Sequence, residues 1–142
     1  MNLMASQKHL DILSSGNTLW GKWRRAYPDV QAVEPDLHEA DLHGVDLHGV
    51  DLHRADLTEA NLQEADLRGA DLRGADLRNA NLCRTDLRGA DLSKADLRGA
   101  DLDGALLDKA IFDEASLSGV DLSGVDLSKA DVRGSVRTGT RA

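Results

Sequence analysis

Four histidines are the residues of this sequence with the clearest capacity for chemistry. They are His38, His43, His48 and His53, spaced five residues apart and each directly after a leucine. Imidazole nitrogens are common metal ligands, but the ligands of a metal site must converge on one point. Histidine pairs on one helix face are three or four residues apart, unlike these. Whether the four can share an ion therefore depends on the elements that carry them.

One cysteine and a long series of aspartates are the remaining candidates for catalysis. Cys83 follows Leu82, and the sequence around it contains no histidine that would serve as its base. A thiol without such a base is more often a solvent-facing side chain than a nucleophile. The aspartates recur almost every five residues, whereas a catalytic site needs a few differently placed groups. We therefore expect no catalytic residues, no cofactor and no enzyme activity.

A period of five residues governs most of the chain. From Leu37 to Val132 every fifth residue is apolar, with eighteen leucines among the twenty positions. The residue two places earlier is small, alanine in fourteen units and valine in four. The residue just before the apolar one is Asp or Asn in seventeen units, and Gly stands two places after it in ten. Internal repetition on this scale predicts a solenoid in which each unit packs on its neighbours.

This period excludes the two standard regular elements. Five residues of an α-helix rotate by about 500°, which displaces successive leucines by about 140° and leaves no apolar stripe. On one continuous strand, an odd spacing sends each leucine to the opposite face from the last. The pattern is satisfied if the chain turns a corner in every unit, with the leucine and the small residue facing an axis and the aspartate facing out. We rank disorder far behind this, because a leucine in every unit supplies ample apolar area.

These units closely resemble those of the pentapeptide-repeat proteins, in which a small residue, Asp or Asn, and Leu or Phe precede two variable residues. Ala65-Asp66-Leu67-Arg68-Gly69 is one such unit, and the resemblance covers residues 35–134, the shaft. It implies an all-β solenoid: a right-handed quadrilateral parallel β-helix with four units per coil and about five coils. Four units per coil would direct the four histidines from four different sides. We therefore predict no metal site among them.

Residues 1–34 are predicted to form an N-terminal helical cap and linker, and residues 135–142 a short tail. Ser6 is a suitable N-cap for a helix that closes at Gly16, and a second helix is expected from Asn17 or Thr18 to a point before Pro28. Its apolar stripe consists of Leu19, Trp20, Trp23 and Tyr27. We expect the stripe to pack on the first coil as a plug; a binding platform is the alternative.

Charge is concentrated on the shaft. Residues 35–134 contain 22 acidic and 11 basic residues, a net charge of −11, whereas the whole chain carries −8. Binding to nucleic-acid phosphates requires a basic surface, so we expect no direct nucleic-acid partner. Arginines interleave with the aspartates in the middle of the shaft, which makes that part mixed in charge.

One irregularity in the repeat marks a possible contact surface. The outward acidic position is occupied by Leu106, Ile111 and Ser116 in three successive units. Leu106 and Ile111 are expected to point outward on adjacent sides, next to Asp108 and Asp113. We call these four residues the Leu106 patch. From the sequence we favour slight imperfection of the repeat, or burial under the C-terminal tail, and a contact surface is the alternative.

Taken together, these features predict a non-catalytic scaffold that binds another protein along its sides. The resemblance offers an alternative, because some members of the family mimic acidic DNA and regulate a type II topoisomerase, gyrase. The single cysteine excludes a disulfide scaffold, and no apolar run approaches the 18 residues of a membrane span. We expect a cytoplasmic protein with no secretory signal, no membrane partner, and either a monomer or weak end-to-end association.

Overall fold

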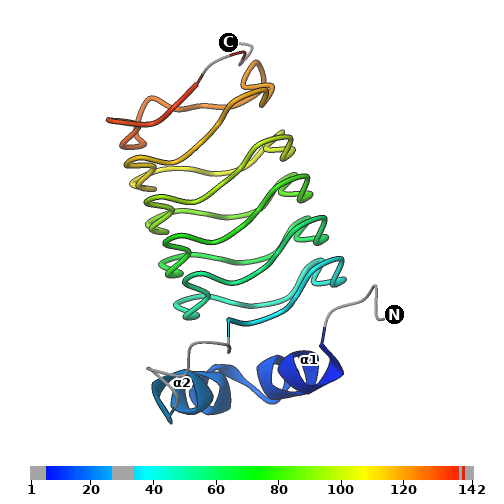
Figure 1. Ribbon diagram of the computed structural model, residues 1–142. Coiled ribbons are helices and arrows are strands. Elements are labelled where there is room, and N and C mark those ends of the chain that lie inside the picture. The colour runs from blue at the N-terminus through cyan, green and yellow to red at the C-terminus, as the bar shows by residue number, and fades with distance from the viewer. Residues whose placement is uncertain (1–5, 27–33, 138, 140–142) are drawn as a thin grey trace.

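The computed structural model describes residues 6–26, 34–137 and 139. Two helices lie across one end of a stack of coils, α1 over Gln7–Ser14 and α2 over Asn17–Ala26 (Figure 1). The coils then follow one another in chain order, away from the helices (Figure 1). Tyr27 and the other residues of 27–33 lie outside the described part of the chain.

The repeat winds with twenty residues per coil. Parallel bridges join the outward position of each unit to the one twenty residues later, as in Asp36 to Asp56 and Asp56 to Asp76. Four units therefore make one coil, and each unit forms one side. We number the sides from the first coil, so that sides 1 to 4 begin at Asp36, Asp41, Asp46 and Asp51. The predicted parallel stacking of four units per coil agrees with this register.

A corner of four residues closes each unit. In the first unit the Ala40 N–H donates to the Leu37 carbonyl oxygen at 3.1 Å, and Glu39 between them has a φ of 58°. Among the described residues of the shaft, nine non-glycine residues adopt this left-handed conformation beside the glycines. L-residues with side chains rarely adopt it, so the stacked coils impose the corner wherever glycine is missing.

The axis is filled by the leucines and the small residues. Leu57, Leu77 and Leu97, stacked on side 1, each have no exposed surface. Phe112 takes the leucine position on side 4 and is also fully buried. The one buried polar side chain in the described chain is Thr85, whose hydroxyl donates to the Leu62 carbonyl at 2.7 Å. Every coil thus adds apolar area to one continuous core.

The two helices bind the open edge of the first coil. Ser6 accepts from the His9 N–H at 3.4 Å as the N-cap of α1, and Gly16, with φ 111°, separates α1 from α2, close to the predicted boundaries. Trp20 is fully buried, and its indole Nε1 donates to the Asp51 carbonyl at 2.6 Å. Arg24 Nη2 donates to the His53 carbonyl, also at 2.6 Å.

Further contacts show that the helices occupy the place of a preceding coil. Within the shaft, a carbonyl at the outward position accepts an N–H from the coil before it, as the Asp56 carbonyl does from Leu37. The first coil has no such coil before it, and the Asp36 carbonyl accepts from the Ser6 N–H at 3.1 Å instead. The Asp36 N–H in turn donates to His9 Nδ1 at 2.8 Å. Exposed strand edges invite unwanted pairing, and these bonds cover them.

The repeat is less regular near its C-terminal end. Bridges join Ile111 to Asp131 and Ser116 to Val136, so the register continues into the segment predicted as the tail. Just before the first of these bridges, the Lys109 N–H donates to the Lys129 carbonyl, whereas the earlier coils pair such a residue with the carbonyl nineteen residues later, as Glu39 pairs with Thr58. The axial residues here are only partly buried against the core: Val125, Leu127, Ala130 and Val132.

Candidate functional site

The outward aspartates organise the surface of the shaft. In the unit Ala65–Gly69, the Asp66 carboxylate accepts the Arg68 N–H at 3.1 Å, which closes a local turn. It also accepts Arg68 Nε at 2.9 Å and Nη2 at 2.7 Å, a bidentate ion pair. The same bidentate pair recurs in five further units: Asp71–Arg73, Asp76–Arg78, Asp86–Arg88, Asp96–Arg98 and Asp131–Arg133. The aspartates thus have a structural role.

These pairs stabilise the ionised carboxylates. The hydrogen bonds from Arg68 lower the pKa of Asp66 to about 2. Those from Arg133 lower the pKa of Asp131 to about 2 as well. A carboxyl group with so low a pKa cannot donate a proton near neutral pH, so neither residue is suited to general acid catalysis.

Each of the four histidines binds the aspartate two residues before it. His43 Nδ1 lies 2.8 Å from Asp41 Oδ1, and this hydrogen bond raises the pKa of His43. His38 and His48 make the same contact with Asp36 and Asp46, and His53 makes it with Asp51. Four consecutive units make one coil, so the histidines occupy its four sides, and no described group of potential metal ligands contains two of them.

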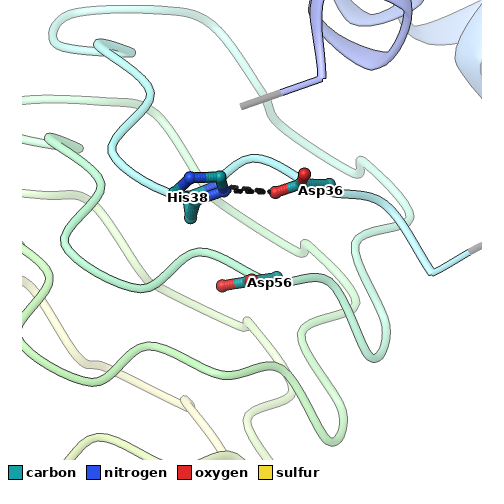
Figure 2. Close-up of side chains that lie close together, drawn as sticks. All are labelled: Asp36, His38 and Asp56. Carbon is teal, nitrogen blue, oxygen red and sulfur yellow. Dashed lines mark hydrogen bonds and ion pairs between the residues drawn. The ribbon is translucent and has the colours of Figure 1, made fainter. Parts of the chain in front are cut away.

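The structure does assemble potential metal ligands that the sequence analysis did not identify. Asp36, His38 and Asp56 on side 1 have ligand atoms within 4.8 Å of one another (Figure 2). The third ligand comes from the next coil, twenty residues away, and only the coil length reveals it. Comparable groups are Asp46–His48–Asp66 and Asp51–His53–Asp71. In those two, the later aspartate already holds Arg68 or Arg73.

The side 1 group also has hydrogen bonds that explain it without a metal. Asp36 Oδ1 lies 2.5 Å from His38 Nδ1 (Figure 2). Asp56 accepts a hydrogen bond from the Thr58 hydroxyl at 2.7 Å, and Thr58, like His38, stands two residues after its aspartate. Each carboxylate therefore has a partner within its own unit, as in the arginine-bearing units.

Cys83 has the chemistry of an inert thiol. It is half-buried, and its burial, together with the Asp101 and Asp103 carboxylates, raises the pKa of the thiol to about 11. The thiolate is the nucleophilic form, so a raised pKa disfavours reaction.

The stripe predicted on α2 divides between two surfaces. Trp20 is fully buried and Trp23 packs partly against the core, as expected of a plug. Leu19 is 51% exposed, and its predicted packing on the first coil is wrong, because adjacent helix residues differ by about 100° and Trp20 takes the inward direction. Tyr27 lies outside the described residues.

Leu19 instead lines a shallow groove between α1 and α2, which we call the cap groove. It has a volume of about 370 Å³ and is lined by Ile12, Ser15, Leu19, Lys22, Trp23 and Ala26. The wall is apolar except for Ser15 and the charged, exposed Lys22.

The Leu106 patch lies on the fourth coil. Leu106 on side 3 is 49% exposed, and Ile111 on side 4 is half-buried. Asp108 and Asp113 are both exposed, and neither makes an ion pair within the described chain. Below the patch, Asp86 and Asp91 occupy the outward positions of the same two sides. Leu106 thus replaces an acidic side chain with an apolar one in contact with solvent.

The fold defines the class of protein: a parallel β-solenoid of five-residue units with a helical cap. A family model described as pentapeptide repeats matches residues 36–74, 65–104 and 100–136, in eight copies. These matches extend over more than half of the chain, which therefore belongs to the pentapeptide-repeat family.

Solved structures of the same family are similar to this chain. Rfr23 from the cyanobacterium Cyanothece 51142 is 38% identical with a TM-score of 0.52, over 65% of this chain and 59% of that one. HetL from the cyanobacterium Nostoc sp. PCC 7120, described as involved in heterocyst differentiation regulation, is 30% identical with a TM-score of 0.45. That match covers 74% of this chain and 60% of HetL. This chain thus spans about three fifths of the length of each.

A more distant likeness links the chain to QnrB1, a plasmid-mediated fluoroquinolone resistance protein. The two are 21% identical with a TM-score of 0.33, over 71% of this chain and 76% of QnrB1, and this likeness carries no argument about function. No curated protein sequence matches the chain significantly. Neither described helix has the length and apolar character needed to cross a membrane.

Proposed function

We propose that this protein is a non-catalytic interaction module, and that it binds another protein through the side of its shaft at the Leu106 patch. The observation that carries the proposal is the exposure of Leu106, at 49%, in a position that holds an acidic side chain in most units. Exposed apolar groups that lie together on an otherwise polar surface are typical of protein contacts.

The rest of the shaft supports a structural role. Its axial positions are filled by side chains, so the described coils offer a substrate no internal cavity. The Arg–Asp pairs hold many of the outward side chains in fixed positions. A rigid shaft of this kind presents a surface without needing to move. We also retain the right-handed sense of the coils and a cytoplasmic location as parts of this proposal.

The test compares the wild type with Leu106→Asp/Ile111→Asp in a pull-down from a lysate of the native organism. Both substitutions restore the acidic residue of the usual unit, so the fold is expected to survive. The matched control is Val136→Asp, which changes a side chain that is also 49% exposed and occupies the same outward position on side 1. A partner lost from the double variant and kept by the control supports the proposal; equal capture by all three contradicts it.

Regulation of a type II topoisomerase by an acidic, DNA-like surface is the second candidate. The net charge of −11 on residues 35–134 favours it. The bidentate arginines weigh against it, because they neutralise much of the acidic surface on sides 1, 3 and 4. We rank it below a scaffold role for that reason.

A further inference from the structure

The cap groove is an apolar surface with a positive border. Leu19 and Trp23 of α2 and Ile12 of α1 provide the apolar wall, and Lys22 provides a charge. Of the four basic residues in the described cap, residues 6–26, the Arg24 side chain is buried and pairs with Asp51, and Lys22 is the one that lines the groove. A partner for this groove must therefore present an apolar side chain beside carboxylates.

The same chain carries a surface of that kind. In the Leu106 patch an exposed leucine lies close in sequence to two carboxylates that make no ion pair in the described chain, Asp108 and Asp113. Lys109 is the one basic residue among residues 105–114, which hold three acids and carry a net charge of −2. The patch and the groove are complementary in charge, and both are apolar at the centre.

The groove and the patch cannot meet within one molecule. Trp20 and Arg24 bind the cap to the first coil, through the Asp51 and His53 carbonyls. The patch is on the fourth coil, and three coil spacings separate these coils by about 14 Å along the shaft. The two helices lie at one end of the stack, and the fourth coil is further along it (Figure 1).

We infer that the cap groove of one molecule binds the Leu106 patch of a second copy of this chain. The inference rests on the proposed function, because it assigns a partner to the same patch. The two contacting surfaces differ, so the contact is heterologous: a pair joined by one contact still has a free groove on one molecule and a free patch on the other. Further copies add at these free surfaces and generate open chains, unless the rotation between copies closes them into a ring. The apolar area on each side is small, which predicts weak association.

Sedimentation equilibrium on the whole protein tests this. The wild type is expected to weigh 15.3 kDa when dilute and more than twice that at millimolar concentration in low salt, with the increase reduced by high salt. Leu19→Asp removes the apolar centre of the groove, and Leu106→Asp removes that of the patch. Each variant alone is expected to remain at 15.3 kDa. Val136→Asp, the control of equal exposure, is expected to assemble like the wild type.

An equimolar mixture of the two variants gives the sharpest result. Leu106→Asp keeps an intact groove and Leu19→Asp keeps an intact patch, so one contact remains possible. The mixture should therefore stop at a 1:1 dimer of twice 15.3 kDa and form no longer chains. If circular dichroism shows that Leu19→Asp is unfolded, Lys22→Glu takes its place.

Three outcomes would overturn the inference: a wild type that stays at 15.3 kDa throughout, a mixture without a dimer, or equal loss of assembly in Val136→Asp. The pull-down separates this failure from that of the proposed function. A monomeric wild type whose other partner is lost in Leu106→Asp overturns self-association alone. If Leu106→Asp assembles like the wild type and captures the same partners, both the self-association and the proposed function are overturned.

Discussion

The Trp20 indole and the Asp51 carbonyl oxygen are joined by a hydrogen bond of 2.6 Å, and the indole is fully buried. One side chain of α2 thus supplies both the apolar contact and the donor that a preceding coil would have supplied. The end of the solenoid is stabilised by this double role.

Replacing Trp20 with Phe keeps an aromatic ring but removes the donor. The Asp51 carbonyl is then left buried without its partner, which is expected to cost about 1–3 kcal/mol of unfolding free energy. Urea denaturation followed by circular dichroism measures it. Leu19→Ala, on the exposed neighbour, is expected to change the midpoint very little; similar losses in both variants would contradict the assigned orientation of α2.

Leu77 and Arg78 are adjacent in the middle of the shaft, and their side chains point in opposite directions, inward and outward. Leu77 is fully buried, so Leu77→Asp places a charge without a partner in the apolar axis and should abolish the cooperative unfolding transition. Arg78 is exposed and pairs with Asp76 at the surface, so Arg78→Ala should leave the transition nearly unchanged. Thermal unfolding monitored by circular dichroism distinguishes them, and equal effects would refute the inward and outward assignment.

Acid should detach the cap before it unfolds the shaft. Burial lowers the pKa of His9, whose Nδ1 accepts the Asp36 N–H only when that nitrogen is unprotonated. As the pH falls, His9 is therefore protonated in the unfolded chain before it is protonated in the folded protein. The stability that this contact supplies is present above pH 6.5 and is lost as the pH falls below 6.5. Asp66 has its pKa lowered to about 2 by Arg68, so its contribution is present above pH 3.8 and is lost only as the pH approaches 2.

Two probes can follow the cap and the shaft separately. Both tryptophans of the chain lie in α2, so their fluorescence reports the cap, whereas far-ultraviolet circular dichroism mainly reports the coils. Fluorescence should change as the pH falls below 6.5, well before the dichroism signal. In His9→Ala this early change should be much smaller. His43 acts in the opposite direction, because its pKa is raised by Asp41, but it lies exposed on the surface and solvent weakens its effect.

Cys83 should react slowly with thiol reagents in the folded protein. With a pKa of about 11 instead of 9.0, the thiolate at pH 8 is about a hundredfold scarcer than for an unperturbed thiol. The rate of reaction with a colorimetric disulfide reagent, in buffer and in denaturant, measures the difference. A folded-state rate as fast as the denatured one would exclude the proposed protection.

The topoisomerase alternative has a direct assay. Because arginines pair with the aspartates on three sides of the shaft, we expect micromolar protein to leave gyrase supercoiling unchanged and to give no protection from quinolone inhibition. Charge reversal of Arg68, Arg78, Arg88 and Arg98 to Glu provides the control, because it removes the bidentate arginines from sides 1 and 3. Inhibition of supercoiling by the wild type at micromolar concentration would place DNA mimicry ahead of the scaffold role.

The five-residue period was sufficient to predict the direction of nearly every shaft residue, because a corner in each unit leaves only one arrangement that buries Leu and Ala together. The capping residues Ser6 and Gly16 identified the helix boundaries, which depend on local chemistry. The helical spacing of α2 could not separate Leu19 from Trp20, since both fit an apolar stripe and the choice depends on which one reaches the Asp51 carbonyl.

The groups of potential metal ligands show the same limit. Asp36 and His38 are neighbours in sequence, but Asp56 joins them only through the twenty-residue coil. Ile111 was expected to face solvent as Leu106 does, but it is half-buried like most outward aspartates, because coils on both sides cover it, as its bridges to Asp91 and Asp131 show. Side-chain contacts between distant units follow from the three-dimensional stacking and have no local signature.

The twenty-residue coil also separates the length of the molecule from the direction in which it presents its surfaces. Removal of twenty consecutive shaft residues would shorten the stack by one rung and return all later units to their own sides. Removal of five would rotate all later units by a quarter turn relative to α1 and α2. The angle between the cap groove and the Leu106 patch is thus set by the number of units between them, counted modulo four. Changes in whole coils alter how far apart the two surfaces lie, and changes in single units alter the azimuth at which one copy would meet the next.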